Sequence, residues 1–203
     1  MYGTVRDRRT LVTVIPVLAM LAAWPAIGQA QNVAGQAQAA RATVLDPLGG
    51  ASTLALADTG TLGGTTDARE ASQLSGEVTS ILTGTTLHAT TIGWPDQVAS
   101  QASLADLALA VAGTSVGADF VMAEALAIRD TAGSGSTNID NLAVNGVAVS
   151  VTGAPNQTIP IPGGRVVINE QQEFPGGLVV NALRVVVDGV ADVVVGSATA
   201  GVR

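Results

Sequence analysis

His88 is the only histidine of the chain and the first candidate for catalysis. A histidine acts as a general base when a carboxylate orients it and a nucleophile lies within hydrogen-bond reach. The residues around His88 read TTLHATTI, with the alternation typical of a strand. We therefore interpret His88 as a strand residue that faces solvent.

Glu170 and Glu173 form the second candidate, a pair of carboxylates for glycoside hydrolysis. That reaction needs one carboxyl group to stay protonated, so its pKa must be raised selectively. Both residues are expected at the end of a strand, beside a turn at Phe174-Pro175-Gly176-Gly177. No apolar cluster surrounds them in the sequence. The prediction is a pair of solvated carboxylates in a turn.

Two groups of oxygen-bearing side chains could bind calcium, which takes carboxylate and carbonyl ligands. One group is Asn138, Asp140 and Asn141, and the other is Asp188 with Asp192. Neither has EF-hand spacing, and Asp and Asn also occur in turns for their turn geometry. The chain has no cysteine, which excludes disulfides and zinc-thiolate sites. We predict no catalytic, cofactor-binding or metal-binding residue, with calcium as the one metal left open.

The stretch from Asn138 to Ala198 contains the elements that would position these residues. Its apolar residues alternate with small or polar ones, as in β-strands. Asn145-Gly146 and Asp188-Gly189 suit two-residue hairpin turns with positive φ angles. Pro162 to Arg165 forms a further turn, because proline fixes φ and glycines follow it. The pattern predicts antiparallel hairpins.

The preceding segments Leu104 to Val111 and Val116 to Ile128 are compatible with helix or strand. Their Ala, Leu, Met and Glu residues favour helix, whereas their alternation favours strands joined by a turn at Gly113 to Ser115. We expect strands. A short likeness between Leu104 to Gly113 and Ile139 to Gly146 is compatible with a β-solenoid, but the hairpin turns favour an antiparallel β-sandwich.

Shorter strands are expected earlier in the chain, separated by turns rich in glycine and proline. Asn32 to Ala42, rich in Gln and Ala, is expected to be a flexible arm. Thr131 to Thr137 is expected to be a loop. The strands expected from the pattern are Thr43 to Leu45, Ser52 to Leu56, Gly76 to Leu82 and Thr85 to Ile92.

Residues 1–30 have the features of a secretory signal peptide, expected to be helical. Arginines precede an apolar run from Leu11 to Ala23, and Gly28-Gln29-Ala30 suits cleavage after Ala30. Arg8-Arg9 leaves the twin-arginine route open beside the general secretory route. An uncleaved membrane anchor is the alternative. The predicted organisation is a signal peptide over 1–30, an arm over 31–42 and one all-β domain over 43–203.

The charge of the chain limits its partners. The formal net charge is -7, and from Gln31 onward six arginines stand against fifteen acidic residues, with no lysine. An acidic surface repels phosphate backbones, which argues against nucleic acid and against anionic membranes. Mean hydropathy is +0.43, so much of the polar surface must come from uncharged side chains and backbone.

Three segments carry a resemblance to a known family: PNQTIPIPGGRVVINEQ at Pro155 to Gln171, VNALRVVV at Val180 to Val187, and ADVVVGSATAG at Ala191 to Gly201. Together they resemble the C-terminal half of the bacterial choice-of-anchor P family. The resemblance implies an exported domain tethered to the cell envelope, and it supplies no catalytic or binding residue.

We therefore expect an exported, non-enzymatic, β-rich protein of the envelope or extracellular space, acting as a structural or adhesive surface module. Its partners would be envelope or extracellular-matrix components. The alternative is a secreted hydrolase or a carbohydrate- or ligand-binding domain with a cleft near Trp94 and Glu170. Convergence of Trp94, Glu170, Glu173 and His88 in one pocket would favour that alternative.

Overall fold

The computed structural model describes residues 32–45 and 49–203. The predicted signal peptide over 1–30 lies outside these residues. Within them, no helix is long and apolar enough to cross a membrane.

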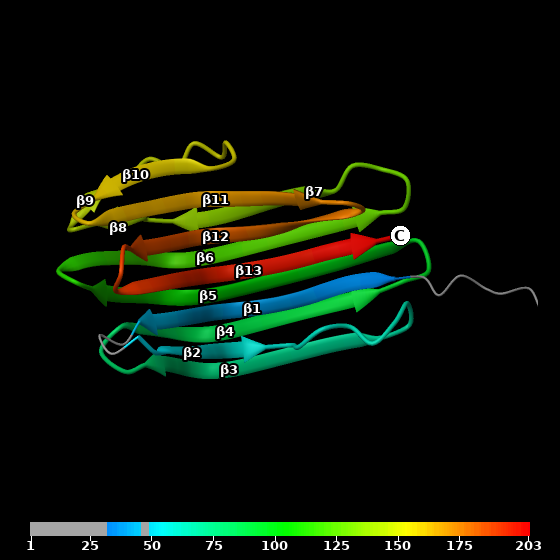
Figure 1. The fold of residues 1–203 in the computed structure, drawn as a ribbon, viewed down its shortest axis with the longest axis horizontal. Helices are drawn as coiled ribbons and strands as arrows, with labels where there is room; N and C mark the ends of the chain where they lie inside the picture. Colours follow the sequence, from blue (N-terminus) through cyan, green and yellow to red (C-terminus); the bar gives the residue numbers. More distant parts are fainter. Residues whose placement is uncertain (1–31, 46–48) are drawn as a thin grey trace, which may run out of the picture. The chain divides into compact units, whose positions relative to one another are not determined.

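Thirteen strands form two antiparallel sheets, labelled in Figure 1. Sheet A has the order β10-β11-β12-β13-β1-β2. Its strands are β1 (Val33–Leu45), β2 (Ala51–Asp58), β10 (Gln157–Ile161), β11 (Gly164–Phe174), β12 (Gly177–Val187) and β13 (Ala191–Val202).

Sheet B has the order β3-β4-β5-β6-β8-β9, and β7 also pairs with β6. Its strands are β3 (Ala68–Val78), β4 (Leu82–Gly93), β5 (Gln97–Val111), β6 (Thr114–Ile128), β7 (Ser134–Asp140), β8 (Ala143–Val144) and β9 (Val147–Ala148).

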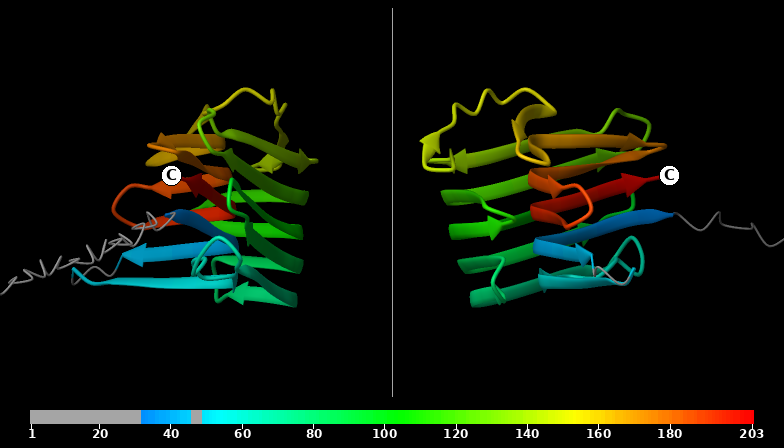
Figure 2. Two further views of the ribbon diagram at one scale, coloured as in Figure 1. Left: turned by 90° about the vertical axis from the view of Figure 1, so that its right-hand side faces the viewer. Right: turned by 60° about the vertical axis from the view of Figure 1, so that its left-hand side comes forward.

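The two sheets stack face to face, as the edge-on view in Figure 2 shows. Between them lies one apolar core, built mainly from Val, Leu and Ala, in which Leu104 and Val121 of sheet B and Val180 and Val195 of sheet A are fully buried. This arrangement confirms the predicted antiparallel β-sandwich. The β-solenoid alternative was wrong, because neighbouring strands fold back on one another in hairpins.

The hairpin turns lie where the sequence predicts them. Asn145 and Gly146 have φ angles of 50° and 76°, as a type I′ turn requires. Gly163 turns the chain between β10 and β11 with φ of 69°. Between β12 and β13 the ladder closes at Val187 and Ala191, so Val190 lengthens the loop at Asp188-Gly189.

The predicted arm over 31–42 was wrong. Val33–Leu45 forms β1, which lies between β13 and β2 in sheet A. The Ala and Gln residues alternate on it: Ala37 and Ala39 are buried between the sheets, while Gln36 and Gln38 lie on the outer face. A strand whose inner face packs closely against a second sheet needs small side chains there, and alanine supplies them.

Three boundaries also differ from the predicted ones. The turn between β5 and β6 is Ala112-Gly113, and Thr114 already belongs to β6. The expected loop over 131–137 ends early, because β7 begins at Ser134. The chain turns over 79–81, between β3 and β4, whereas a strand was expected across Gly76 to Leu82.

Five strands of sheet A each contain one residue that has no paired partner on the neighbouring strands. These five residues lie side by side in one line across the sheet. Before and after this line the pairing keeps the same register, so all five strands carry the irregularity together. We call these residues the pleat-shift row of sheet A. They are, across the sheet, Ala57, Ala39, Gly196, Ala182 and Asn169.

The pleat-shift row changes which residues of a strand point inward. On β13, Val193 and Val195 are buried before Gly196, whereas Ala198 and Ala200 are buried after it. Alternation in an unbroken strand would keep one parity throughout. Gly196 has φ of 63°, and a Cβ there would lie 3.5 Å from the backbone nitrogen of Ala123 in sheet B. The sheets therefore approach closely at this row.

Sheet B has a pleat-shift row of its own. Asp106 and Asn141 both belong to it, with φ angles of 51° and 53°. These two residues occupy the same place in the two similar segments Leu104 to Gly113 and Ile139 to Gly146. The likeness between the segments thus reflects one shared local geometry. The members of the row are Leu74, Thr86, Asp106, Asp119 and Asn141.

Candidate functional site

His88 lies on β4, on the outer face of sheet B. Its Nδ1 is 3.0 Å from Oγ of Ser72 and 3.7 Å from Oε1 of Glu70, both on the neighbouring strand β3. The side chain is 40% exposed. This is the solvent-facing strand position that the sequence predicts, and its partners form a cross-strand surface pair.

Glu170 is not in a turn, contrary to prediction. It lies in the middle of β11, is only 9% exposed, and its Oε1 accepts a 2.8 Å hydrogen bond from Nη1 of Arg184. Glu173 is exposed near the end of the same strand. Three residues apart in a strand, the two side chains point to opposite faces. They cannot flank one glycosidic bond as a carboxylate pair.

The four residues of the cleft hypothesis do not converge. Glu170 lies on the outer face of sheet A, and His88 on the outer face of sheet B. Trp94 lies in the turn between β4 and β5, where its N–H donates to the carbonyl of Gln97. The predicted cleft near Trp94 and Glu170 is therefore wrong.

Gly113 to Gly117 reads G-T-S-V-G and matches the Gly-x-Ser-x-Gly pattern, which our sequence analysis overlooked. A nucleophile elbow places the serine between a strand and a helix. Here Ser115 stands in β6, next to a hairpin turn, and its N–H donates to Oδ1 of Asn145. His88 pairs across the strands with Ser103, which in turn pairs with Met122 on β6. Met122 is seven residues, or roughly 23 Å, along β6 from Ser115. The match has no catalytic geometry.

In each of the two candidate calcium sites, one residue is hydrogen-bonded to a neighbouring strand. Asp192 is bound by Arg184 through two hydrogen bonds of 2.9 and 2.6 Å. Nδ2 of Asn141 donates to Oδ2 of Asp119 at 2.6 Å. Within residues 32–45 and 49–203, no three His, Cys, Asp or Glu side chains come together as metal ligands would. Asn141 and Asp192 thus each make a cross-strand contact.

A continuous row of polar side chains crosses the outer face of sheet A beside the pleat-shift row. We call it the polar row. Nδ2 of Asn181 donates to Glu170 at 2.6 Å, and Oγ of Ser197 donates to Asn181 at 2.7 Å. At the other end Nε2 of Gln38 donates to Asp58 at 2.9 Å. The members face one another in register across five strands: Glu170, Asn181, Ser197, Gln38 and Asp58.

Arg184 binds two carboxylates on this face. It donates to Glu170 at 2.8 Å and to both oxygens of Asp192. The hydrogen bonds to Asp192 and Glu170 raise the pKa of the guanidinium against the opposing effect of burial. Arg184 is therefore held in its charged form, and it holds Glu170 in place on the sheet.

On the outer face of sheet A, the row of residues next to the polar row alternates between arginine and valine from strand to strand. Val167, Arg184, Val194 and Arg41 are neighbours in register. Val167 and Val194 are only 7% and 2% exposed although they lie on the outer face. Arginine stems pack along apolar surface while the charged end stays in water. The side chains of Arg41 and Arg184 thus cover Val167 and Val194 and project above them. We call these two arginines the arginine border.

Next to this border the outer face of sheet A is hollowed into a groove of about 360 Å³. We call it the sheet A groove. Its floor is made of short side chains on the central strands β12 and β13, including Asn181, Ser197 and Thr199. Its sides are made of longer ones: Gln172 on β11, and Gln36, Gln38 and Arg41 on β1. Long residues beside short ones produce the depth.

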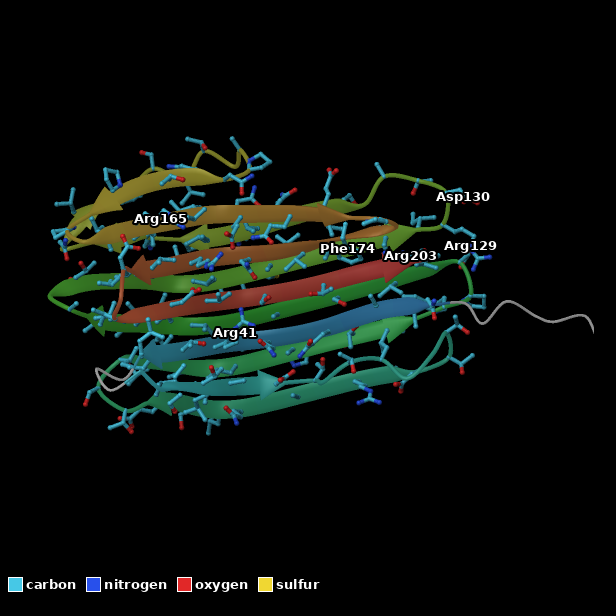
Figure 3. All side chains as sticks on the ribbon, in the orientation of Figure 1. Arg41, Arg129, Asp130, Arg165, Phe174 and Arg203 are labelled. Carbon is cyan, nitrogen blue, oxygen red and sulfur yellow. The ribbon has the colours of Figure 1, made fainter. Side chains whose placement is uncertain are left out.

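Phe174 lies outside the lining of this groove, in the next row of the outer face after Gln172 on β11, where it lines a smaller hollow of about 250 Å³ together with Pro175 and Arg203. A Cβ at Gly177 would be 2.7 Å from its ring, and a Cβ at Gly201 would be 2.8 Å from it. The ring therefore rests against the backbone of two neighbouring strands, which only glycines permit. Figure 3 shows Phe174 and Arg203 near the end of β13, and Arg41 farther along the same face.

The outer face of sheet B carries two broader hollows. One, of about 750 Å³, is lined largely by small and apolar residues such as Ala108, Ala110 and Gly117. The other, of about 410 Å³, lies around Ala99 and Leu126. Their linings are mostly apolar, whereas the lining of the sheet A groove is mostly polar.

The sequence analysis missed the groove because it paired Glu170 with Glu173 on the same strand and not with residues of the neighbouring strands. A signal was present: Asn181 and Arg184 interrupt a run of apolar residues in a strand with both neighbours in the sheet. A polar residue buried in such a strand requires partners. The partners Ser197 and Asp192 lie on the following strand, at positions that the hairpin turn at Asp188-Gly189 fixes.

Comparison with protein-family models, with curated proteins and with solved structures gives no match.

Proposed function

We propose that this chain is an exported, non-enzymatic module of the bacterial envelope or extracellular space that acts through its surface, as a structural or adhesive protein. The supporting observation is how its ionisable side chains are used. On sheet A, Glu170 is bound by Arg184 and Asn181. On sheet B, His88 pairs with Ser72 of the neighbouring strand. These groups stabilise strands.

The fold suits such a role. A two-layer sandwich with a continuous apolar core is rigid and presents two broad faces to its surroundings. The outer face of sheet B is built largely from Thr, Ser, Gln and Ala on β4 and β5, whereas the outer face of sheet A places paired charges beside Gln, Asn and Ser. Large exposed faces with satisfied polar groups serve binding and assembly better than chemistry, which requires convergent side chains.

Export and location rest on the sequence. The expected signal peptide over 1–30 and the resemblance to the choice-of-anchor P family both support a protein of the envelope or extracellular space. Envelope or extracellular-matrix components are the proposed partners.

Cell fractionation with intact-mass measurement tests this proposal. We expect the protein outside the cytoplasm, with the intact mass of a chain that begins at Gln31. A membrane-held product that retains Met1 would instead support the anchor alternative for Leu11 to Ile27. A cytoplasmic protein with an intact N-terminus would contradict the proposal.

A ligand-binding domain is the second candidate, and one observation favours it. The sheet A groove places amides and hydroxyl groups on one face, and the ring of Phe174 lies in the adjoining hollow of the same face. An adhesive module needs such a site, so the two candidates are compatible.

A further inference from the structure

We propose that the sheet A groove binds an uncharged oligosaccharide, with Phe174 as the platform against which one sugar ring stacks. This inference deepens the proposed adhesive function, on which it rests for its biological setting. It assigns the site, the residues and the ligand class.

The groove carries the groups that recognise sugar hydroxyls. A hydroxyl group is both donor and acceptor, and a carboxamide offers both as well. Gln172 and Gln36 stand on opposite sides of the groove, and Ser197 and Thr199 lie on its floor. Gln172 is exposed, and Ser197 and Thr199 are half-buried. A chain of hydroxyl groups lying along the groove would meet such a group on each side and below.

The charge balance favours a neutral ligand. Arg41 and Arg184 are the charged residues that line the groove. Three carboxylates border the groove: Glu170 and Asp192 bind Arg184, and Asp58 accepts from Gln38. Two positive and three negative charges leave this face close to neutral. A polyanion would gain little there, and the acidic protein would repel it.

Phe174 supplies the apolar contact that a sugar ring needs. Its ring lies against the backbone at Gly177 and Gly201, which fixes its orientation. The side chain is half-buried, so part of its surface remains open to a ligand. Sugar rings have apolar C–H faces, and aromatic surfaces combine large apolar area with little side-chain entropy to lose. The platform is preorganised.

The length of the face suits a chain of several sugar units. From Arg184 to Gly177 along β12 is seven residues, or roughly 23 Å. The arginine border lies at one end of the groove, the amides and hydroxyls follow it, and Phe174 lies in the row beyond them, in the neighbouring hollow. Figure 3 shows Arg41 and Phe174 well apart along the length of the strands.

Isothermal titration calorimetry of the full chain would test the site. The probes are hexasaccharides of β-1,4-glucose, β-1,4-xylose, β-1,4-mannose, β-1,4-N-acetylglucosamine and α-1,4-glucose, each at millimolar concentration. Hexa-galacturonate and a neutral Gly-Ser hexapeptide serve as the anionic and peptide probes. We expect at least one uncharged hexasaccharide to bind more tightly than either of these two.

Two variants and two matched controls locate the binding. We expect Phe174→Ala and Gln172→Ala each to weaken binding by about tenfold, the equivalent of about 1.4 kcal/mol. Phe120→Ala removes the aromatic side chain of β6, and Gln101→Ala removes an amide of β5, both in sheet B. These controls should bind as the unaltered chain does. Circular dichroism would verify that each variant is folded.

Three outcomes would overturn the inference. They are no binding of any uncharged hexasaccharide, tighter binding of the galacturonate or the peptide, and equal weakening by the sheet B controls. Fractionation tests the proposed function separately. If the protein is found outside the cytoplasm but binds no sugar, the sugar-binding inference is wrong and the proposed function still stands. If the protein is cytoplasmic but binds sugar, the proposed location is wrong and the sugar-binding inference still stands.

Discussion

Oε2 of Glu170 accepts a 2.6 Å hydrogen bond from Nδ2 of Asn181, the residue directly opposite it on β12. Its other oxygen is held by Arg184. Both oxygens of this side chain, which is only 11% exposed, therefore have hydrogen-bond donors. Glu170 is thus held by two residues of one neighbouring strand, β12.

Arg184→Met should lower the free energy of unfolding by about 1 to 3 kcal/mol, because it leaves a buried carboxylate without its cation. Urea denaturation would measure the change. The double variant Glu170→Gln and Arg184→Met should recover part of the loss, since the amide does not require a cation. If the two single losses simply add in the double variant, the pair is not coupled and the prediction fails.

Gly196→Ala should destabilise the protein more than Gly189→Ala. Both glycines have positive φ, at 63° and 71°, so each substitution carries a backbone cost of roughly 1 to 2 kcal/mol. A Cβ at Gly189 meets nothing within 4 Å, whereas one at Gly196 would lie 3.2 Å from Cβ of Ala182. We expect an additional loss of about 1 kcal/mol or more at Gly196. Equal midpoints in thermal melts would contradict the tight packing around Gly196.

Gly146→Val should destabilise the turn between β8 and β9 by roughly 1 to 3 kcal/mol. A Cβ at Gly146 meets nothing within 4 Å, so the cost comes only from its φ of 76°. Gly146→Asn is the matched control, because asparagine tolerates this conformation. Hydrogen exchange at Asn145, whose N–H donates to Ser115, would report the local opening. Equal exchange in both variants would refute the turn assignment.

Asp67 should contribute stability at neutral pH and lose it in acid. Hydrogen bonds from the N–H of Gly63 and from Arg69 lower the pKa of this carboxyl. A carboxyl with a lowered pKa stabilises the fold above its unfolded pKa of about 4, and the contribution disappears as pH falls through the folded pKa. Asp67→Asn should therefore melt earlier than the unaltered chain at pH 7.

The difference in melting temperature between Asp67→Asn and the unaltered chain should shrink as the pH falls through the lowered pKa of folded Asp67 and vanish below it, where both forms lack the carboxylate. Asp130→Asn, at an exposed turn residue, is the control. A gap of constant size from neutral pH to acid would show that Asp67 acts through shape and not through its charge.

The sandwich could be predicted because its turns are encoded locally. Asn145-Gly146 and Asp188-Gly189 supply positive φ angles, and alternation on either side supplies the strands. The arm over 31–42 was mispredicted for the opposite reason. Its Ala and Gln residues have weak strand propensity, and they form β1 because β13 and β2 pair with it on both sides.

The ambiguity between helix and strand at Leu104 to Val111 also has a structural cause. Leu104 and Leu107 are both buried, and a spacing of three suggests a helix. The structure produces this spacing in a strand, because Asp106 of the pleat-shift row takes up the extra residue. Periodicity alone cannot distinguish the two.

The sheet A groove could not be predicted, because it depends on pairing between distant strands. Gln36 and Gln172 are far apart in sequence, and the order β11-β12-β13-β1 brings them to opposite sides of one hollow. Phe174 appears in the sequence as part of a turn, and only the positions of Gly177 and Gly201 show that its ring lies on the sheet.

The pleat-shift rows also address a difficulty of this composition. Strands made largely of Ala, Val and Thr look alike when they slide past one another by two residues, so many misaligned pairings would bury similar surface. Each strand that crosses a row carries one irregular residue, and a slid strand would set that residue against a regular one. The rows act as alignment marks, and they allow a nearly repetitive sequence to select one folded state over its slipped alternatives.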